Sequence, residues 1–374
     1  MKIAQCQLKG DYKIQGVDEK AGLVLVFGDR ALIEAGDIAE KFKAGYPKAN
    51  IVFCSTAGEI LNTEVSDNTL AVTAIEFEKT EIKTNLSNIS NFKDSYEAGK
   101  QLVEKLQEGN LKHIIVLADG QLVNGSELVR GMNEILDGKV TISGGLAGDG
   151  PRFQKTLVGL DSNIVAGNLV AIGLYGDHLL VGHGSNGGWD SFGPYRKVTK
   201  SKSNVLYELE GKSALDLYKQ YLGDLADGLP GTALLFPLSI KISDDSEPVV
   251  RTILSVSEAD HSMTFAGDIP EGSYARLMKA NLDRLIDAAS GAANTAYTSF
   301  NGMQPELALL ISCVGRKLVL DQRVDEEVES VRDILGNKTF MTGFYSYGEI
   351  SPLTKSSKCE LHNQTMTITA FSEI

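Results

Sequence analysis

Short runs of apolar residues alternate along the chain with segments in which apolar residues recur at helical spacing. Leu23–Phe27 predicts a buried strand, residues 31–44 carry apolar side chains every three or four positions, and Ile51–Phe53 predicts a second strand. A corner at Glu59, which directly follows a glycine, leads to another apolar run, Thr69–Ile75. The first 75 residues therefore predict strand, helix, strand, corner and strand.

The same order of elements recurs near the C-terminus and, more loosely, in the middle of the chain. The C-terminal copy begins with a strand at Leu307–Ile311, has its corner at Glu349, and ends with a strand at Thr365–Phe371. The middle copy runs from a strand at His113–Leu117 to a strand at Leu169–Leu174. This recurrence predicts an internal duplication.

The middle copy also has a Gly-acid corner, at Asp149, and Ser126 is the expected N-cap of its helix. A further corner at Asp268 precedes an apolar pattern at residues 274–289 that predicts a long helix. Apolar residues pause at Lys200–Asn204. We therefore predict two domains, residues 21–203 and 204–374.

Strands that are joined by a helix of a dozen residues normally become parallel neighbours in one sheet. The sequence also predicts antiparallel hairpins, for example residues 153–160 with 164–174. The expected fold class is α/β, with two related mixed-sheet domains and added antiparallel hairpins.

Composition and charge narrow the class of protein. The chain has 36 Lys and Arg against 49 Asp and Glu, a net charge of −13, which repels nucleic acid and anionic membrane surfaces. The four cysteines lie far apart with no C-x-x-C pair, which argues against a zinc site and indicates a reducing compartment. The sequence contains no signal peptide and no apolar stretch of membrane-spanning length. We expect a cytoplasmic protein with neither nucleic-acid nor membrane partners.

Several motifs resemble the FIST family, over residues 21 to 352. They are Leu23–Phe27 followed by Cys54-Ser55-Thr56-Ala57-Gly58-Glu59-Ile60, then Gly144-Gly145-Leu146-Ala147-Gly148-Asp149-Gly150, Gly188-Trp189, Cys313-Val314-Gly315-Arg316 and Gly343-Phe344-Tyr345-Ser346-Tyr347-Gly348-Glu349-Ile350. The resemblance implies an N-terminal and a C-terminal FIST domain that together form a small-ligand sensor of signal transduction. Amino acids are suggested as ligands of the family, and some members are described as haem-based nitric-oxide sensors.

The resemblance also implies a signalling partner, because family members are often fused to output domains. This sequence ends at Ile374 without one. We therefore expect a separate kinase, chemoreceptor or cyclase to act in trans.

Five residues are predicted to approach one another in a ligand crevice at a sheet edge. Glu59, Asp149 and Glu349 follow glycines near strand ends and could hold an ammonium group, while Arg316 could hold a carboxylate and Tyr345 could line the wall. Such a crevice would bind an amino acid or a small carboxylate. In the alternative, each acid only caps its turn and Arg316 pairs with a neighbouring acid.

Five further residues complete the predicted ligand-binding set. Alternation places Tyr347 on the same strand face as Tyr345, Cys54 and Ser55 stand at a strand end, and Gly144 and Gly145 begin a glycine-rich loop. The alternatives are core packing for Tyr347 and Cys54 and a turn for Ser55. The loop lacks the Lys-Ser/Thr that ends a phosphate loop.

Two rival functions remain open. An enzyme could use Cys54 or the acidic corners on a small metabolite, although no histidine or G-x-S-x-G elbow accompanies that cysteine. A haem sensor would need an axial ligand, for which His183 and His178 are the candidates. The leading expectation is a sensor with no catalytic residues, no cofactor and no metal.

Overall fold

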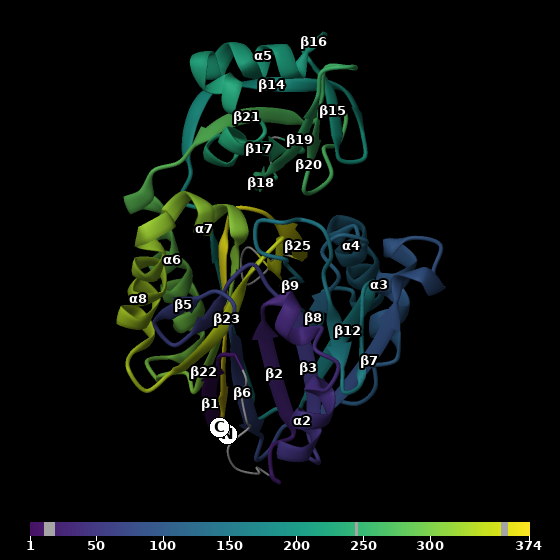
Figure 1. The fold of residues 1–374 in the computed structure, drawn as a ribbon, viewed down its shortest axis with the longest axis vertical. Helices are drawn as coiled ribbons and strands as arrows, with labels where there is room; N and C mark the ends of the chain where they lie inside the picture. The colour runs from purple at the N-terminus through teal and green to yellow at the C-terminus, as the bar shows by residue number, and fades with distance from the viewer. Residues whose placement is uncertain (11–18, 244–245, 353–357) are drawn as a thin grey trace.

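A computed structural model describes residues 1–10, 19–243, 246–352 and 358–374 of the chain (Figure 1). The described strands form three six-stranded sheets and one eight-stranded sheet. The three six-stranded sheets and their helices make up the body of the molecule. The eight-stranded sheet belongs to a small domain, residues 190–279, at one end of the body, at the top of Figure 1.

The three sheets of the body share one strand order. The first sheet contains β1 (Lys2–Leu8), β6 (Leu70–Glu76), β2 (Leu23–Gly28), β3 (Asn50–Ser55), β10 (Val158–Leu160) and β11 (Asn163–Val165). The second contains β7 (Glu81–Asn88), β12 (Asn168–Tyr175), β8 (Leu111–Ala118), β9 (Thr141–Leu146), β24 (Gly348–Pro352) and β25 (Cys359–His362). The third contains β13 (Leu179–Asn186), β26 (Met366–Glu373), β22 (Leu307–Cys313), β23 (Phe340–Ser346), β4 (Glu59–Leu61) and β5 (Glu64–Ser66).

Each sheet has a parallel pair at its centre and an antiparallel hairpin from another unit at one edge. The parallel pairs are β2 with β3, β8 with β9, and β22 with β23. The first unit contributes hairpin β4–β5 to the third sheet, the second contributes β10–β11 to the first, and the third contributes β24–β25 to the second. The predicted duplication and mixed α/β fold are confirmed, and the exchange of hairpins joins three units in a ring.

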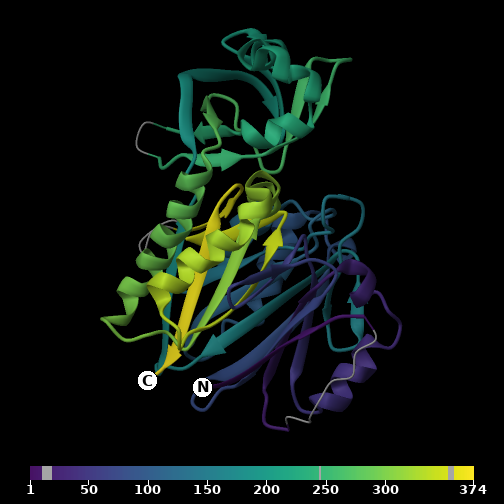
Figure 2. The ribbon, with the colours of Figure 1, turned by 60° about the vertical axis from the view of Figure 1, so that its left-hand side comes forward.

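The helices cover the outer faces of the sheets. The first unit contains α1 (Arg30–Ile33) and α2 (Ile38–Gly45); the second contains η1 (Ile89–Asn91), α3 (Ser95–Glu104) and α4 (Gly125–Leu136); the third contains α6 (Leu282–Tyr297), η4 (Thr298–Phe300), α7 (Val314–Leu320), η5 (Asp321–Arg323) and α8 (Val324–Leu335). Figure 2 shows α6 and α8 on the outer side of the third sheet. The inner faces of all three sheets meet in a central core that includes Phe27, Leu117, Ile311 and Phe344.

Three local predictions were wrong. The segment 31–44 is not one helix, because α1 ends at Ile33 and α2 begins at Ile38. Residues 274–279 form strand β21, and Asn281 caps the following helix by accepting a hydrogen bond from the Arg284 N–H. A short apolar run fits a strand as well as a helix, so periodicity alone did not separate them.

The third error concerns the cap of α4. Asn124, and not Ser126, is the N-cap, and its side chain accepts a hydrogen bond from the N–H of Glu127. Both residues are good capping types, and Asn124 has the three-residue spacing to Glu127 that a capping pair needs.

The small domain interrupts the third unit between β13 and α6. It contains β14 (Asp190–Lys202), β15 (Val205–Leu209), β16 (Lys212–Ser213), α5 (Ala214–Leu222), η2 (Gly223–Gly228), η3 (Gly231–Leu235), β17 (Leu238–Lys241), β18 (Val249–Arg251), β19 (Ile253–Ser257), β20 (Ser262–Phe265) and β21 (Tyr274–Lys279). It has a hydrophobic core of its own, which includes Val198, Tyr218 and Phe265. The predicted boundary between the two domains, at residues 203–204, falls in the turn between β14 and β15. The division of the chain into domains 21–203 and 204–374 stays a prediction.

Candidate functional site: the cleft between the body and the small domain

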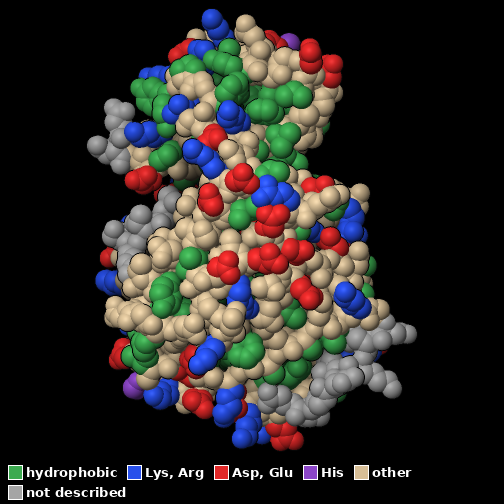
Figure 3. Space-filling view, turned by 90° about the vertical axis from the view of Figure 1, so that its left-hand side faces the viewer, with side chains coloured by type: hydrophobic (Ala, Val, Ile, Leu, Met, Phe, Trp, Pro, Cys, Tyr) green, Lys and Arg blue, Asp and Glu red, His purple; other side chains and the backbone are tan. Residues whose placement is uncertain are grey.

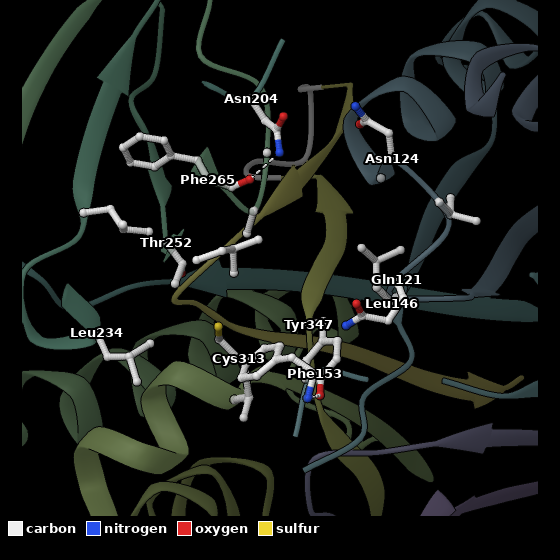
Figure 4. A pocket seen from close by; sticks show the side chains of 18 of the residues that line it. Gln121, Asn124, Leu146, Phe153, Asn204, Leu234, Thr252, Phe265, Cys313 and Tyr347 are labelled. Carbon is white, nitrogen blue, oxygen red and sulfur yellow. Dashed lines mark hydrogen bonds between the residues drawn. The ribbon is translucent and has the colours of Figure 1, made fainter. Parts of the chain in front are cut away.

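A cleft of about 680 Å³ lies where the small domain faces the body (Figure 4). On the body side it is lined by the loop Gly120–Gly125, which follows β8, and by residues at the ends of β9, β22 and β23. These are the carboxyl ends of parallel strands, the edge at which α/β sheets bind ligands. Figure 4 shows Asn204, Thr252 and Phe265 of the small domain opposite Gln121 and Asn124 of the body.

A ring of backbone hydrogen bonds holds the floor of the cleft. Each unit donates one N–H, close beyond the end of its second parallel strand, to the strand end of another unit. The bonds run from Ala57 to Tyr345 (2.8 Å), from Gly148 to Ser55 (2.8 Å) and from Tyr347 to Leu146 (3.2 Å). The ring fixes Leu146 and Tyr347, which both line the cleft.

Two stacked aromatic rings form one wall. The ring centroids of Phe153 and Tyr347 lie 4.4 Å apart with 16° between the planes. The Tyr347 hydroxyl donates to the Gly150 carbonyl (3.0 Å) and accepts from the Phe153 N–H (3.2 Å). Burial raises the pKa of Tyr347 to about 12, so the phenol stays neutral. Because the hydroxyl already has partners, the aromatic surface is what this pair offers to a ligand.

Polar groups lie on both sides of the cleft. Asn124 caps α4 and donates across the domain boundary to Asp268 (3.2 Å). Asn204 donates to the carbonyl of Phe265 (2.7 Å). The Thr252 hydroxyl is buried and has no hydrogen-bond partner among the described residues. A buried hydroxyl without a partner is costly, and a ligand could supply one.

Cys313 lies at the floor of the cleft, at the start of α7. Burial raises the pKa of its thiol, so the sulfur stays protonated and weakly nucleophilic. No histidine or carboxylate lines the cleft in the described part of the chain to act as a base. The arrangement is suited to binding a molecule and lacks a nucleophile–base pair among these lining residues.

Two of the predicted acids, Glu59 and Glu349, form hydrogen bonds within the body and do not line the cleft. Glu59 accepts hydrogen bonds from the hydroxyls of Thr56 (2.6 Å) and Thr69 (2.8 Å), and Glu349 accepts from the N–H (3.1 Å) and hydroxyl (2.9 Å) of Thr365. Burial raises the pKa of Glu59 to about 7 and of Glu349 to about 8, although these hydrogen bonds oppose the shift. Each carboxyl connects its corner to the start of the last strand of its unit, which agrees with the alternative of a turn cap.

Asp149 is not the counterpart of those two acids. The backbone ring makes Gly148 equivalent to Ala57, so Asp149 occupies the position of Gly58, one residue earlier than Glu59. Its carboxylate accepts hydrogen bonds from Arg30 (3.0 Å) and Arg152 (2.7 Å). Burial alone would raise its pKa, but these two guanidinium groups lower it.

Arg316 is held by an acid of α8 and by two backbone carbonyls. Its guanidinium is fully buried and donates to Glu327 (2.7 Å) and to the carbonyls of Gly187 (2.5 Å) and Leu285 (2.7 Å). The hydroxyl of Tyr345 also donates to Glu327 (2.7 Å). Arg316 and Tyr345 therefore share Glu327 of α8 and make no hydrogen bond to Glu59, Asp149 or Glu349 among the described residues. The Arg316 charge still acts on one of the three acids, because it lowers the pKa of Glu349 against the larger effect of burial.

The remaining predicted ligand-binding residues, except for Tyr347, are packed or hydrogen-bonded within the body and do not line the cleft. Cys54 is fully buried, which raises the pKa of its thiol, and the Ser55 hydroxyl donates to the Gly148 carbonyl (2.8 Å). Gly144 and Gly145 lie within β9, where strands approach closely. Tyr347 is the one predicted ligand-binding residue that lines the cleft. Sequence reasoning missed the loop Gly120–Gly125, whose signal was its position directly after a buried strand.

The histidines proposed as haem ligands do not line the cleft. His183 lies in β13, half-buried, with its ring centroid 5.1 Å from that of His113, and burial of its ring lowers its pKa to about 4. His178 is exposed in the turn before β13. Haem with either residue as axial ligand therefore does not fit this cleft. The described residues contain no cluster of His, Cys, Asp or Glu suited to a metal ion, and none of their helices is long and apolar enough to span a membrane.

Comparison with known proteins gives a family and distant relatives. The FIST N domain model matches residues 22–212, and the FIST C domain model matches residues 214–352. An uncharacterized protein of Methanocaldococcus jannaschii, MJ1623, is 23% identical over 347 residues, which are 83% of this chain and 62% of that protein. The chain thus matches less than two thirds of that relative's length.

Two solved structures align with nearly the whole chain at low similarity. A chorismatase aligns at a TM-score of 0.36 with 10% identity, covering 99% of this chain and 98% of its own. A cyanuric acid hydrolase from A. caulinodans aligns at 0.34 with 7% identity and the same coverage.

Proposed function

The chain belongs to the FIST family, and from this premise we propose that it is a sensor that binds its small ligand in the cleft between the body and the small domain. FIST domains are associated with signal-transduction sensing and small-ligand binding. The observation that carries the proposal is the position of the cleft. It combines the carboxyl edge of the body's sheets with residues of a separately folded domain.

The connection between the two parts supports a role in signalling. The small domain joins the body through two chain segments that lie next to each other, since Asp190 pairs with Lys279. The molecule narrows at this junction in the space-filling view (Figure 3). Polar side-chain contacts that cross the junction include Asn124 to Asp268 and Arg251 to the Leu361 carbonyl (2.9 Å). A ligand that touches both sides would favour the closed arrangement over an open one.

The output would pass to another protein. We propose a separate kinase, chemoreceptor or cyclase in the cytoplasm as the partner that recognises the ligand-bound arrangement. The neutral thiol of Cys313 and the lack of a base in the described lining support a sensor without catalysis.

An amino acid or a small carboxylate was the ligand predicted from the sequence. That prediction rested on Arg316 and the acids Glu59, Asp149 and Glu349, all of which have partners inside the protein. These residues no longer support it.

A ligand screen with a matched pair of variants tests the site. Leu254→Trp would place a bulky side chain in the lining of the cleft, whereas Leu318→Trp places the same side chain at an exposed leucine outside it. A compound at 100 times its Kd should stabilise the wild-type protein by about 2.7 kcal/mol in a thermal-shift assay. We expect this stabilisation to persist in Leu318→Trp and to disappear in Leu254→Trp. Equal stabilisation of both variants by every active compound would contradict the cleft as the binding site.

A further inference from the structure

The side chains that line the cleft are uncharged throughout the described part of the chain, although 23% of the whole sequence is Asp, Glu, Lys or Arg. The lining consists of glycines, aliphatic side chains, aromatic rings, side-chain amides, one threonine hydroxyl and one thiol. We propose that the ligand is an uncharged molecule with a flat apolar ring and one hydrogen-bonding edge. This inference rests on the proposed function, because it assumes that the cleft is the ligand site.

Charges just behind the lining already have partners within the protein. Asp119 accepts hydrogen bonds from the N–H groups of Gln121 (2.8 Å), Leu122 (2.7 Å) and Gly167 (2.9 Å). Arg251 donates to the Leu361 carbonyl, and its guanidinium lies behind Gly267. A charged ligand would therefore lose its hydration without gaining an ion pair from a lining side chain, which disfavours its entry.

Two helix starts lie in the described lining: the seven-residue α7 begins at Cys313–Val314, and the longer α4 begins after Asn124. Helix N-termini favour negative charge. Here Asn124 caps the helix, Glu127 places an acid in its first turn, and the buried Asp119 lies behind the preceding loop. These two acids oppose the attraction that the helix would exert on a carboxylate.

The stacked pair Phe153 and Tyr347 indicates the shape of the ligand. Both hydrogen-bonding roles of the Tyr347 hydroxyl are filled, so the pair presents aromatic surface. The facing side of the cleft includes Ile253 and Leu254. A planar ring placed between aromatic and aliphatic surfaces buries apolar area on both faces and packs favourably against the aromatic pair.

The hydrogen-bonding edge follows from polar groups on the two sides of the cleft. Thr252 is 5% exposed, and its hydroxyl has no partner among the described residues. Gln121 lies on the opposite side of the cleft, on the body (Figure 4). A carboxamide, lactam or similar neutral group can both donate and accept, so it can satisfy both side chains. Such a ligand would also connect the two sides of the cleft.

A series of probes with one shape and three charges tests the inference on the full chain. Benzamide is neutral, benzoate is an anion and benzylammonium is a cation, and all three carry the same ring. Ligand-observed saturation-transfer NMR with titration would give their affinities. We expect benzamide to bind at least tenfold more tightly than either ion, and to lose binding in Leu254→Trp.

Two threonine variants test the hydrogen-bonding edge. Thr252→Val removes the unpartnered hydroxyl of a lining residue. Thr342→Val removes another buried hydroxyl without a partner among the described residues, which lies in β23 outside the cleft. We expect Thr252→Val to weaken benzamide binding several-fold and Thr342→Val to leave it unchanged. Equal affinity in both variants would overturn the assignment of Thr252.

The outcomes separate this inference from the proposed function. If benzoate or benzylammonium binds the wild-type protein as tightly as benzamide and no longer binds Leu254→Trp, the ligand need not be uncharged. The inference would then be wrong, while the cleft would remain the ligand site. Absence of benzamide binding would also overturn the inference. The proposed function would fail only if the wider thermal-shift screen found no compound whose effect depends on the cleft.

Discussion

At the scale of single residues, Arg316 and Glu327 form a fully buried ion pair. Breaking such a pair by removing one partner leaves an uncompensated buried charge. We expect Arg316→Met to lower the free energy of unfolding by about 3–5 kcal/mol, measured by urea denaturation. The double variant Arg316→Met with Glu327→Gln should recover part of this loss, since it leaves no isolated charge at this pair. Equal stabilities of the single and double variants would contradict the assignment.

Glu349 gives the protein a pH-dependent stability. Its pKa is about 8 in the folded protein, and the ordinary value is 4.5. Between these values the folded state holds a proton that the unfolded state has released, so stability falls as pH rises through this range. Each unit of pKa difference corresponds to about 1.4 kcal/mol.

We expect Glu349→Gln to remove the contribution of Glu349 to the change in melting temperature between pH 5 and pH 8, because the amide does not titrate. Relative to the wild type, the variant should gain stability as pH rises. Thermal unfolding of both proteins across this range is the measurement. The buried His362, whose pKa is lowered to about 4, acts in the opposite direction below about pH 6.5 in both proteins, so the difference between the two slopes is the test. A variant with the same slope as the wild type would contradict this role. Glu59, with a pKa of about 7, adds to the same trend.

At the scale of elements, β9 depends on a glycine that lets two parallel strands approach. Gly144 has φ +151°, and a Cβ there would lie 1.8 Å from the Val116 carbonyl oxygen of β8. Because both atoms belong to backbone-fixed positions, neither can move freely. We expect Gly144→Ala to destabilise the protein by about 3 kcal/mol or more, or to prevent folding.

Gly36 provides the control, because a Cβ there meets no atom within 4 Å. Gly36→Ala should change stability by less than about 1 kcal/mol, in the stabilising direction. Denaturant unfolding of the two variants is the comparison. Similar stabilities would show that β8 and β9 can separate to admit a side chain.

The sequence predicted the elements better than the site. Buried strands such as Leu23–Gly28 appear as apolar runs, and the repeated order of elements is enough to identify three related units. The corners looked alike in sequence, yet Asp149 lies one position away from its apparent counterparts Glu59 and Glu349. The cleft depends on where the small domain lies against the body, and no local pattern encodes that contact between distant segments.

At the scale of the whole molecule, the small domain is an insertion with its own core. Asp190 and Lys279 are paired across β14 and β21, so a two-residue Asn-Gly turn could join them after the domain is removed. We expect the remaining body to unfold cooperatively and to have no affinity for benzamide. The lost bonds at Asn124 and Arg251 should each cost about 0.5–1.5 kcal/mol.

Circular dichroism, thermal unfolding and the benzamide titration would test this shortened protein against the full chain. A body that fails to fold would show that the small domain is needed for its stability. Retained benzamide affinity would show that the body alone forms the ligand site.

The exchange of hairpins has a consequence for synthesis on the ribosome. Hairpin β4–β5 ends at Ser66, whereas its partner strand β23 begins only at Phe340, about 270 residues later. At about 5–20 residues per second, the early hairpin waits roughly 14–55 s for its partner. During this time its strand edge is open to pairing with other nascent chains. The third sheet also needs β26, which ends at Glu373, so the ring of units can close only after all of the described body has been synthesised.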